Sequence, residues 1–353
     1  MKKYFIGIDF SKKTFDVTML REYDDHNEDL GYKQFDNNNK GYHDFYRWAR
    51  DTAAKGTKSQ WLLCGETTGC YSEGLAEWAY KKGLDIWIEN AYSIKHSLGL
   101  TRGKNDKLDS KRIATYAQEK KRKARLYKPL EGTLKELRVL LRRRQNLDSC
   151  HKAMLNAIKE DKEMYGDDDA IKDIYEKIDE IAADIKDVED QIQERMDTMA
   201  RTEPEMANNY AIVRSTHGIG VINGIAFLVY TDNFTKFQTA NEMATAWGVA
   251  PFNKNSGTTI HTPGHVSFFC NHWLKGLLTC AANRAIQYDN KISNYYNRLI
   301  KKGKKKGVAY NNVKNKMIYI VFTMVKKQTM HDENYDVNKK DKNTKASNPQ
   351  LRA

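Results

Sequence analysis

The chain has 353 residues, 40% of them hydrophobic and 30% charged, which is enough for two or three globular domains. No apolar run approaches the roughly 20 residues that cross a bilayer, and Asp9 comes too early in the chain for a signal peptide. The formal net charge of +13 favours a polyanionic partner, and nucleic acid is the commonest one.

The first 128 residues predict an α/β domain built on a mixed sheet. The elements expected in chain order are strands over 4–10, 14–20 and 32–35, a helix over 41–54, a strand over 61–65, a helix over 72–82, a strand over 84–88 and a helix beginning near Asp106. The short link Ser11-Lys12-Lys13 makes the first two strands a hairpin.

Residues 129–203 predict a helical coiled-coil hairpin, because apolar residues recur there at alternating spacings of three and four. This seam consists of Ile171, Ile174, Ile178, Ile181, Ile185, Val188 and Ile192. A helix pair within one chain and a coiled coil between chains explain it equally well. Residues 204–330 predict an α-rich C-terminal domain, and residues 331–353 a disordered polar tail.

The five cysteines are odd in number and scattered, and they form no Cys-x-x-Cys pair. This pattern argues against a disulfide framework and against a cysteine zinc site. It suits a reducing cytoplasm.

Four acids occupy positions that suit a metal site. Asp9 and Glu66 end predicted strands, whereas Asp106 and Asp109 lie three apart on a predicted helix, with Cβ atoms about 5–6 Å apart. Acids at strand ends and on a helical turn can converge at one edge of a sheet. Carboxylates are the ligands that Mg²⁺ prefers, with Mn²⁺ as the alternative, and phosphodiester cleavage often uses such ions.

Simpler interpretations exist for single members of this set. Asp109 could be an exposed helical acid paired with Arg112, and Asp106 could be only an N-cap. Asp16, on the returning strand, either faces solvent or supports the site from behind the metal ligands. The basic residues expected to hold a phosphate backbone near the helical acids are Lys104, Lys107 and Arg112.

Basic charge also gathers in the runs 120–123, 142–144 and 301–306. Within the last run, Lys304 and Lys305 are candidates for binding nucleic acid, and a solvated loop is the simpler interpretation. The aromatic residues near this run that could stack on single-stranded bases are Tyr295, Tyr296 and Tyr310.

His217-Gly218-Ile219-Gly220 precedes an apolar helix over 221–230 and is similar to a helix-hairpin-helix element. Gly218 and Gly220 would then let a phosphate approach the amide groups at the helix N-terminus. A plain helix-starting turn explains the same residues equally well. Trp247 is expected in the core rather than at a base-stacking surface.

In their order along the chain, these motifs resemble the insertion-sequence 110 (IS110) family of transposases. The resemblance covers about residues 4–328. The motifs that carry it are Ile6-Gly7-Ile8-Asp9, Gly65-Glu66-Thr67-Thr68-Gly69, Lys104-Asn105-Asp106-Lys107-Leu108-Asp109, Ser215-Thr216-His217-Gly218-Ile219-Gly220 and the stretch from Trp247 to Gly257.

The resemblance implies an RNase H-like (RuvC-like) DEDD domain that binds Mg²⁺ through the four acids. It also implies a C-terminal transposase domain whose nucleophilic serine becomes linked to DNA. That serine maps to Ser256 through the pattern Pro-x-x-x-x-Ser-Gly, although composition alone would make Ser256 a turn residue beside Asn253, Asn255 and Gly257.

The family further implies donor and target DNA as substrates and a noncoding bridge RNA as guide. It implies homodimers that pair into tetramers, and a bacterial cytoplasmic, nucleoid-associated location. One departure concerns the basic, glycine-containing stretch that the family often shows after the serine. Here residues 258–265 contain His261 and His265 but no Lys or Arg.

Three other functions fit parts of the sequence. A Holliday-junction-resolvase-like nuclease would use the same acids with water as nucleophile. A sugar-kinase-like or actin-like ATPase would share the opening Gly7-Ile8-Asp9-Phe10-Ser11, but its second Asp-x-Gly phosphate loop is not found. A non-catalytic nucleic-acid-binding scaffold would explain the charge without the acids.

Overall fold

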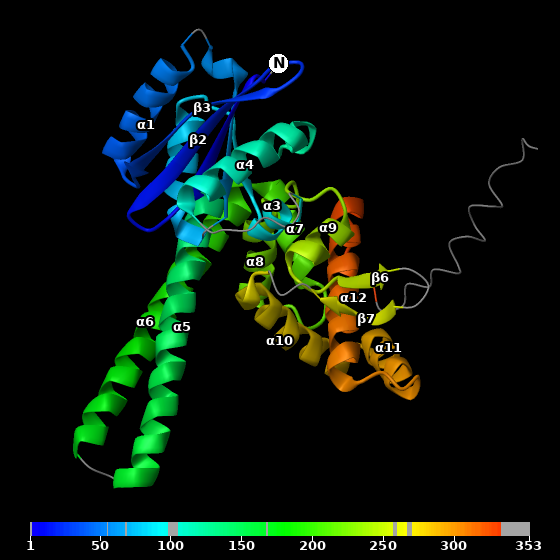
Figure 1. Cartoon of the computed structure of the whole chain (residues 1–353). Helices are drawn as coiled ribbons and strands as arrows, with labels where there is room; N and C mark the ends of the chain where they lie inside the picture. Colours follow the sequence, from blue (N-terminus) through cyan, green and yellow to red (C-terminus); the bar gives the residue numbers. More distant parts are fainter. Residues whose placement is uncertain are drawn as a thin grey trace, which may run out of the picture. The chain divides into compact units, whose positions relative to one another are not determined.

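The computed structural model describes residues 2–54, 56–67, 69–97, 105–166, 169–256, 260–266 and 270–332. The chain divides into two compact units, Met1–Pro129 and Leu130–Ala353 (Figure 1). Lys104, the expected turn acids at 167–168 and residues 333–353 of the expected tail lie outside the described residues. Within the described ranges, no helix is both long enough and apolar enough to span a membrane.

The first unit is an α/β domain with a mixed five-stranded sheet, as predicted. Its elements are β1 (Tyr4–Phe10), β2 (Thr14–Glu22), β3 (Asn27–Asp36), α1 (Asn39–Thr52), β4 (Trp61–Glu66), α2 (Glu73–Lys81), β5 (Ile86–Glu89), α3 (Ala91–Ser97) and α4 (Asp106–Lys120), with short 3₁₀ turns at Lys58–Gln60, Gly69–Tyr71 and Lys121–Lys123. Every predicted element of this unit is present, and the only added α-helix among the described residues is α3.

The sheet has the strand order β3-β2-β1-β4-β5. The first three strands form an antiparallel meander, and β4 and β5 run parallel to β1. This order is the one expected of an RNase H-like domain.

Side chains alternate between the two faces of the sheet, because successive residues of a strand point to opposite sides. In β1, Ile6 and Ile8 pack in a cluster with residues of α1 and α2, whereas Phe5 packs with residues of α3 and α4. Figure 1 shows α1 and α4 on opposite sides of the strands. The face with α4 therefore carries the odd-numbered residues of β1, including Asp9.

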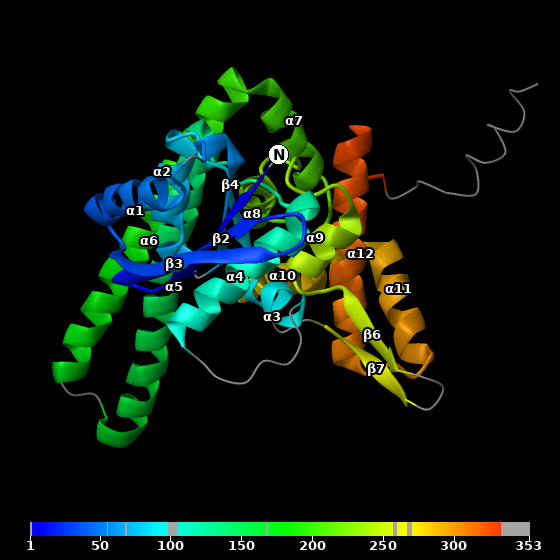
Figure 2. The same cartoon turned by 45° about the horizontal axis from the view of Figure 1, so that its top comes forward.

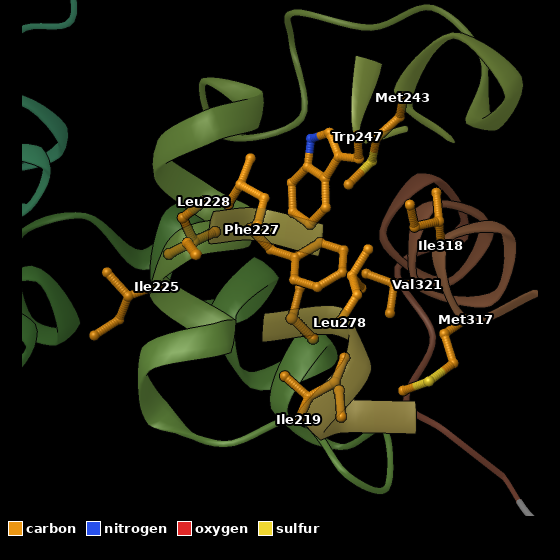
Figure 3. Packing of buried hydrophobic residues seen from close by; sticks show 14 of the residues in the cluster. Ile219, Ile225, Phe227, Leu228, Met243, Trp247, Leu278, Met317, Ile318 and Val321 are labelled. Atoms are coloured by element: carbon orange, nitrogen blue, oxygen red, sulfur yellow. The ribbon is translucent and has the colours of Figure 1, made fainter. Parts of the chain in front are cut away.

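The second unit consists mainly of helices. Its elements are α5 (Gly132–Tyr165), α6 (Asp169–Thr202), α7 (Pro204–Arg214), α8 (Val221–Thr231), α9 (Ala240–Ala246), β6 (Pro251–Ser256), β7 (Ile260–Val266), α10 (His272–Tyr288), α11 (Asn290–Lys301) and α12 (Lys306–Lys327). Figure 3 shows its core, where Phe227 of α8 meets Trp247, Leu278 and Val321. Trp247 is 2% exposed with its ring 4.7 Å from that of Phe227, which confirms it as a core residue.

Helices α5 and α6 lie side by side in both views of the chain (Figures 1 and 2). Of the predicted seam, Ile178, Val188 and Ile192 are buried within the single chain. Two ion pairs cross between the helices, Arg144–Glu189 at 2.6 Å and Arg195–Glu136 at 2.7 Å. Pairing within one chain thus accounts for the buried part of the seam.

The C-terminal part was expected to be helical, but β6 and β7 pair as an antiparallel hairpin (Figure 2). Asn253 and Asn255, expected as turn formers, lie inside β6. Ser256 is the last residue of β6 and pairs with Ile260, so the interpretation of Ser256 as a turn residue was wrong. Residues 257–259, which join the two strands, lie outside the described residues.

Candidate active site

Four acids form a row across neighbouring strands at one edge of the sheet. Asp9 in β1 pairs with Asp16 in β2, and Glu66 in β4 pairs with Glu89 in β5. The parallel register of β1 and β4 places Glu66 beside Asp9. All four lie at the end of the sheet where β1, β4 and β5 finish.

A glycine in β1 lets α4 lie directly against this row. A Cβ on Gly7 would stand 2.1 Å from the carbonyl oxygen of Ser110 and 2.2 Å from the amide nitrogen of Ala114, so no larger residue fits. At the other end of α4, Lys121 Nζ stands 5.6 Å from the ring of Phe5. Helix α4 therefore runs against β1, with its N-terminus above the C-terminal end of the strand.

Further contacts fix the position of α4. The buried hydroxyl groups of Thr18 and Ser110 are hydrogen-bonded at 2.8 Å, which ties the first turns of α4 to β2. Near the other end, Lys121 Nζ lies 2.5 Å from a carboxylate oxygen of Glu22. These contacts hold the helical acids over the sheet edge.

The first turn of α4 carries Asp106 and Asp109. Its N-cap is Asn105, whose side-chain oxygen accepts a hydrogen bond from the amide of Lys107 at 3.1 Å. The interpretation of Asp106 as only an N-cap was therefore wrong. The partial positive charge of a helix N-terminus favours acids at this end of the helix.

The charges of the other three predicted acids act on Asp9. Burial, and then the charges of Glu66, Asp109, Asp106 and Asp16, raise the pKa of Asp9 to about 6. Burial and the charge of Asp109 likewise raise the pKa of Glu66, against the lowering effect of Lys95. A bound cation would relieve this repulsion, and the donor atoms of these carboxylates are hard oxygens of the kind that suit Mg²⁺.

Two of the acids have additional partners. Asp109 accepts a hydrogen bond from Arg112 at 2.7 Å, so the expected helical ion pair is present. Asp16 is buried and accepts hydrogen bonds from the hydroxyl of Tyr32 and from Gln34 Nε2. Of the two alternatives for Asp16, exposure to solvent is thus wrong, and a supporting position next to Asp9 fits.

Sequence reasoning missed two residues of this edge. Glu89 ends β5 as Glu66 ends β4, but the strand was expected to stop at residue 88; its Oε2 accepts a hydrogen bond from Tyr116 at 3.2 Å. Lys95 lies in α3, the helix that the sequence did not predict, and it acts on the pKa of Glu66. The rule that singled out Glu66, an acid closing an apolar strand, would also have found Glu89.

The predicted phosphate contacts near the acids are only partly described. Lys107 is exposed on the first turn of α4, with Nζ 5.5 Å from the ring centre of Tyr32. Arg112 is engaged by Asp109. Lys104 is outside the described residues.

The glycine loop between α7 and α8 has two different glycines. Gly218 has a φ of +87°, and a Cβ there would stand 2.2 Å from the carbonyl oxygen of Ala281 in α10. Close packing inside the unit therefore explains Gly218. Gly220 is the N-cap residue of α8, and, its chain neighbours aside, a Cβ there would meet no atom of the described residues within 4 Å. Gly220 thus leaves the start of α8 accessible from that side.

The basic runs also differ in their surroundings. Lys304 and Lys305 are exposed between α11 and α12, whereas Lys121 and Arg144 are engaged by Glu22 and Glu189. The tyrosines proposed for base stacking already have intramolecular neighbours. Tyr295 has Lys316 Nζ 4.3 Å from its ring centre, and the rings of Tyr296 and Tyr310 are 5.1 Å apart.

In this unit, acids from several strands and from one helix lie at one edge of a mixed sheet. This arrangement is typical of nucleic-acid-processing proteins with DEDD-type domains. Comparison with known proteins agrees. A family model for the DEDD transposase domain of IS110 matches residues 6–160, and a model described as "Transposase IS116/IS110/IS902 family" matches residues 210–297. The chain belongs to the IS110 family of transposases, a family of DNA-processing enzymes.

Individual relatives fit this assignment. The pilin gene-inverting proteins of Moraxella bovis and Moraxella lacunata are each 27% identical over 340 residues, covering 94% of this chain and 99% of theirs. An uncharacterized insertion element IS110 protein of Streptomyces coelicolor is 30% identical over 121 residues, covering 34% of this chain and 30% of its own.

Proposed function

We propose that this protein cleaves and rejoins DNA strands of an insertion sequence through a covalent serine–DNA intermediate, guided by a noncoding bridge RNA. The observation that carries the proposal is the acidic row at the edge of the first sheet, where burial and then the charges of acidic neighbours raise the pKa of Asp9 to about 6. The Moraxella relatives support a rearrangement of DNA segments, since their name assigns them gene inversion.

In this proposal Asp9, Glu66, Asp106 and Asp109 hold Mg²⁺. When bound there, the ion would supply positive charge to the phosphate and to its attacking and leaving oxygens. Asp16 and Tyr32 position Asp9 from the β2 side, and Lys95 and Lys107 add positive charge near the DNA backbone.

Ser256, at the end of β6, is the proposed nucleophile. Its hydroxyl oxygen attacks the phosphorus, the proton leaves to a base, and the bond from phosphorus to the deoxyribose oxygen breaks. The serine is then esterified to one DNA end, and a free hydroxyl of the second strand reverses the step. Such chemistry requires Ser256 and the acids to meet on one DNA, within a chain or between chains of a dimer or tetramer.

The test is to trap the adduct. Purified protein is incubated with the element ends, target DNA, the adjacent noncoding RNA and Mg²⁺, then denatured and resolved for protein-linked DNA. The unaltered protein should form the adduct. Ser256→Ala should form none, and Asp9→Asn or Asp109→Asn should lose at least about 100-fold of the rate, as removal of one stabilising group in an active site does.

A matched control is Ser149→Ala, which removes an exposed hydroxyl from α5 of the same unit. It should keep full activity. Strand cleavage by Ser256→Ala at the normal rate would refute the serine mechanism and favour a resolvase-like nuclease with water as nucleophile. Cleavage at the same sites without RNA would refute the proposal that a bridge RNA guides the protein.

A further inference from the structure

A second group of ligand-type side chains lies in the C-terminal unit, in residues with no part in the proposed strand transfer. The group is His217 from the α7–α8 loop, Asp289 at the start of α11 and His331 after α12. One ligand atom from each lies within 4.8 Å of the others. Three segments that are distant in the chain thus bring two imidazoles and one carboxylate together.

The distances are close to those of a metal site. Asp289 Oδ2 stands 3.1 Å from His331 Nε2 and 3.9 Å from His217 Nδ1. Ligand atoms bound to one tetrahedral Zn²⁺ at about 2.0–2.1 Å are about 3.3 Å apart. The widest separation is at most 4.8 Å and would have to shrink by up to about 1.5 Å on that geometry. The His217 side chain is 41% exposed.

The surroundings hold two of the ligands in place. Asp289 is 1% exposed, and its Oδ1 caps α11 by accepting a hydrogen bond from the amide of Ile292 at 3.0 Å, so Oδ2 is the oxygen directed at both histidines. The backbone amide of His331 donates to Ser215 Oγ at 2.9 Å. Outer contacts of this kind orient metal ligands in known sites.

We propose that His217, Asp289 and His331 bind a divalent transition-metal ion, Zn²⁺ in the first instance. Imidazole nitrogens with one carboxylate suit Zn²⁺, whereas Mg²⁺ takes oxygen ligands, so this site differs in chemistry from the acidic row of the first unit. It is also independent of the cysteines. Three protein ligands leave the fourth tetrahedral position to water or a partner group.

The ion would clamp the segment after α12 to the loop before α8. That loop contains Gly218, whose close packing on α10 already fixes part of its path, and Gly220, where α8 begins. Metal binding would therefore order residues 215–220 and 328–332 together.

The test measures Zn²⁺ binding by the full-length chain after chelator treatment, with excess Mg²⁺ present to occupy the carboxylates of the first unit. A chromophoric chelator competes for Zn²⁺. The unaltered chain should bind one Zn²⁺, and Co²⁺ should give the visible absorption of a four- or five-coordinate site. Zn²⁺ should slow hydrogen exchange at 215–220 and 328–332.

Two variants remove ligands with little cost to the fold. His217→Asn changes a half-exposed side chain, and Asp289→Asn keeps an acceptor for the α11 cap. Loss of a residue that only orients a metal ligand typically weakens metal binding by about 10–100-fold. Because each variant removes a ligand itself, each should weaken Zn²⁺ binding by more than that. The matched control is His272→Asn. His272 lies two residues from Cys270, and these two residues are an alternative place where Zn²⁺ could bind.

The control should bind Zn²⁺ as the unaltered chain does and keep its exchange protection. Equal Zn²⁺ affinity in all four proteins would overturn the proposal. So would a loss of binding in His272→Asn with binding retained in His217→Asn, since the ion would then sit near Cys270.

Discussion

At the residue scale, the most informative side chain is Asp9, because its ordinary pKa of 3.8 rises to about 6. Burial and four acidic neighbours disfavour the ionised form in the folded chain. A raised carboxyl pKa contributes stability below the unfolded value, and that contribution is lost as the pH rises through about 6. Above pH 6, the metal-free fold therefore bears a repulsive charge.

Asp9→Asn should consequently stabilise the metal-free protein at pH 8 while abolishing activity. After discounting for solvent screening we expect a gain on the order of 1 kcal/mol, or about 3 °C in the unfolding temperature. At pH 4 the difference should nearly vanish. Thermal unfolding with and without Mg²⁺ measures this, and Mg²⁺ should raise the unfolding temperature of the unaltered protein but not of the variant.

Asp16→Asn is the matched control, because Asp16 is buried next to Asp9 but has hydrogen-bond donors of its own. Its bond raises the pKa of Tyr32 to about 12, so that hydroxyl remains a donor at pH 8. Losing the charged acceptor should destabilise the protein by about 1–2 kcal/mol. A gain in stability for Asp16→Asn as large as that for Asp9→Asn would contradict this account of the row.

Single residues of the site were predictable where position in an element carried the information. Asp9 and Glu66 lie at the ends of apolar strands, and Asp106 and Asp109 share a helical turn. The partners of Asp16 were not predictable, since Tyr32 and Gln34 reach it through the register of β2 and β3. The same holds for Asp289 and its two histidines, which only tertiary packing brings together.

At the element scale, the position of α4 depends on the absence of a side chain at Gly7. Gly7→Ala would put a methyl group 2.1 Å from the Ser110 carbonyl, and backbone atoms cannot turn aside as a flexible side chain can. We expect a loss of stability of about 3 kcal/mol, the upper part of the usual range for overpacking, and reduced activity as Asp106 and Asp109 move away from Asp9.

Gly276→Ala in α10 tests whether adding a methyl group is harmful in itself. Apart from the backbone of α10 itself, no atom of the described residues lies within 4 Å of the added Cβ, and alanine favours a helix by about 1 kcal/mol over glycine. Thermal unfolding should show this variant slightly more stable and its DNA cleavage unchanged. Equal behaviour of the two variants would contradict the role given to Gly7.

The helical hairpin has two apolar parts. Its root belongs to the main core through Leu137, Leu141 and Val188, whereas Ile158 and Ile178 form a small cluster of their own. Ile178→Ala should therefore speed hydrogen exchange in the outer part of the hairpin, by a local loss of about 2 kcal/mol, and leave the global unfolding temperature nearly unchanged.

Leu141→Ala is the corresponding change at the root, and it should lower global stability by about 2–5 kcal/mol. Hydrogen exchange followed by mass spectrometry separates the two cases. If Ile178→Ala also sped hydrogen exchange in the core of the second unit, the hairpin and that core would have to form one cooperative element.

Strands and helices were predicted correctly where apolar residues recur at a regular spacing. They were missed where contacts with other parts of the chain determine the structure. The strands 4–10 and 14–20 and the seam of α6 carry clear apolar patterns. The β6–β7 hairpin is built from residues such as Asn253, Asn255 and Pro263, which favour turns, so only pairing across the hairpin makes them strands. Helix α3 is too short for its period to be recognised.

At the scale of the whole molecule, the net charge of +13 predicts binding to polyanions, but the distribution of that charge decides where binding occurs. Several basic residues are already neutralised inside the fold, as Lys121 is by Glu22 and Arg144 by Glu189. Charge counting along the sequence cannot separate these from exposed lysines, because the acids that pair with them are distant in the chain.

Lys304 and Lys305 are exposed in the described loop before α12 and form the better test of nucleic-acid contact. Each phosphate contact contributes about 0.9 to the slope of log affinity against log salt for duplex DNA, so Lys304→Gln/Lys305→Gln should lower the slope by about 2. The control is Lys152→Gln/Lys177→Gln, whose lysines pair with Asp148 and Glu180 on the hairpin. Fluorescence anisotropy with donor DNA at several salt concentrations gives both slopes, and an equal decrease in the two variants would mean that net charge alone, rather than this loop, binds the DNA.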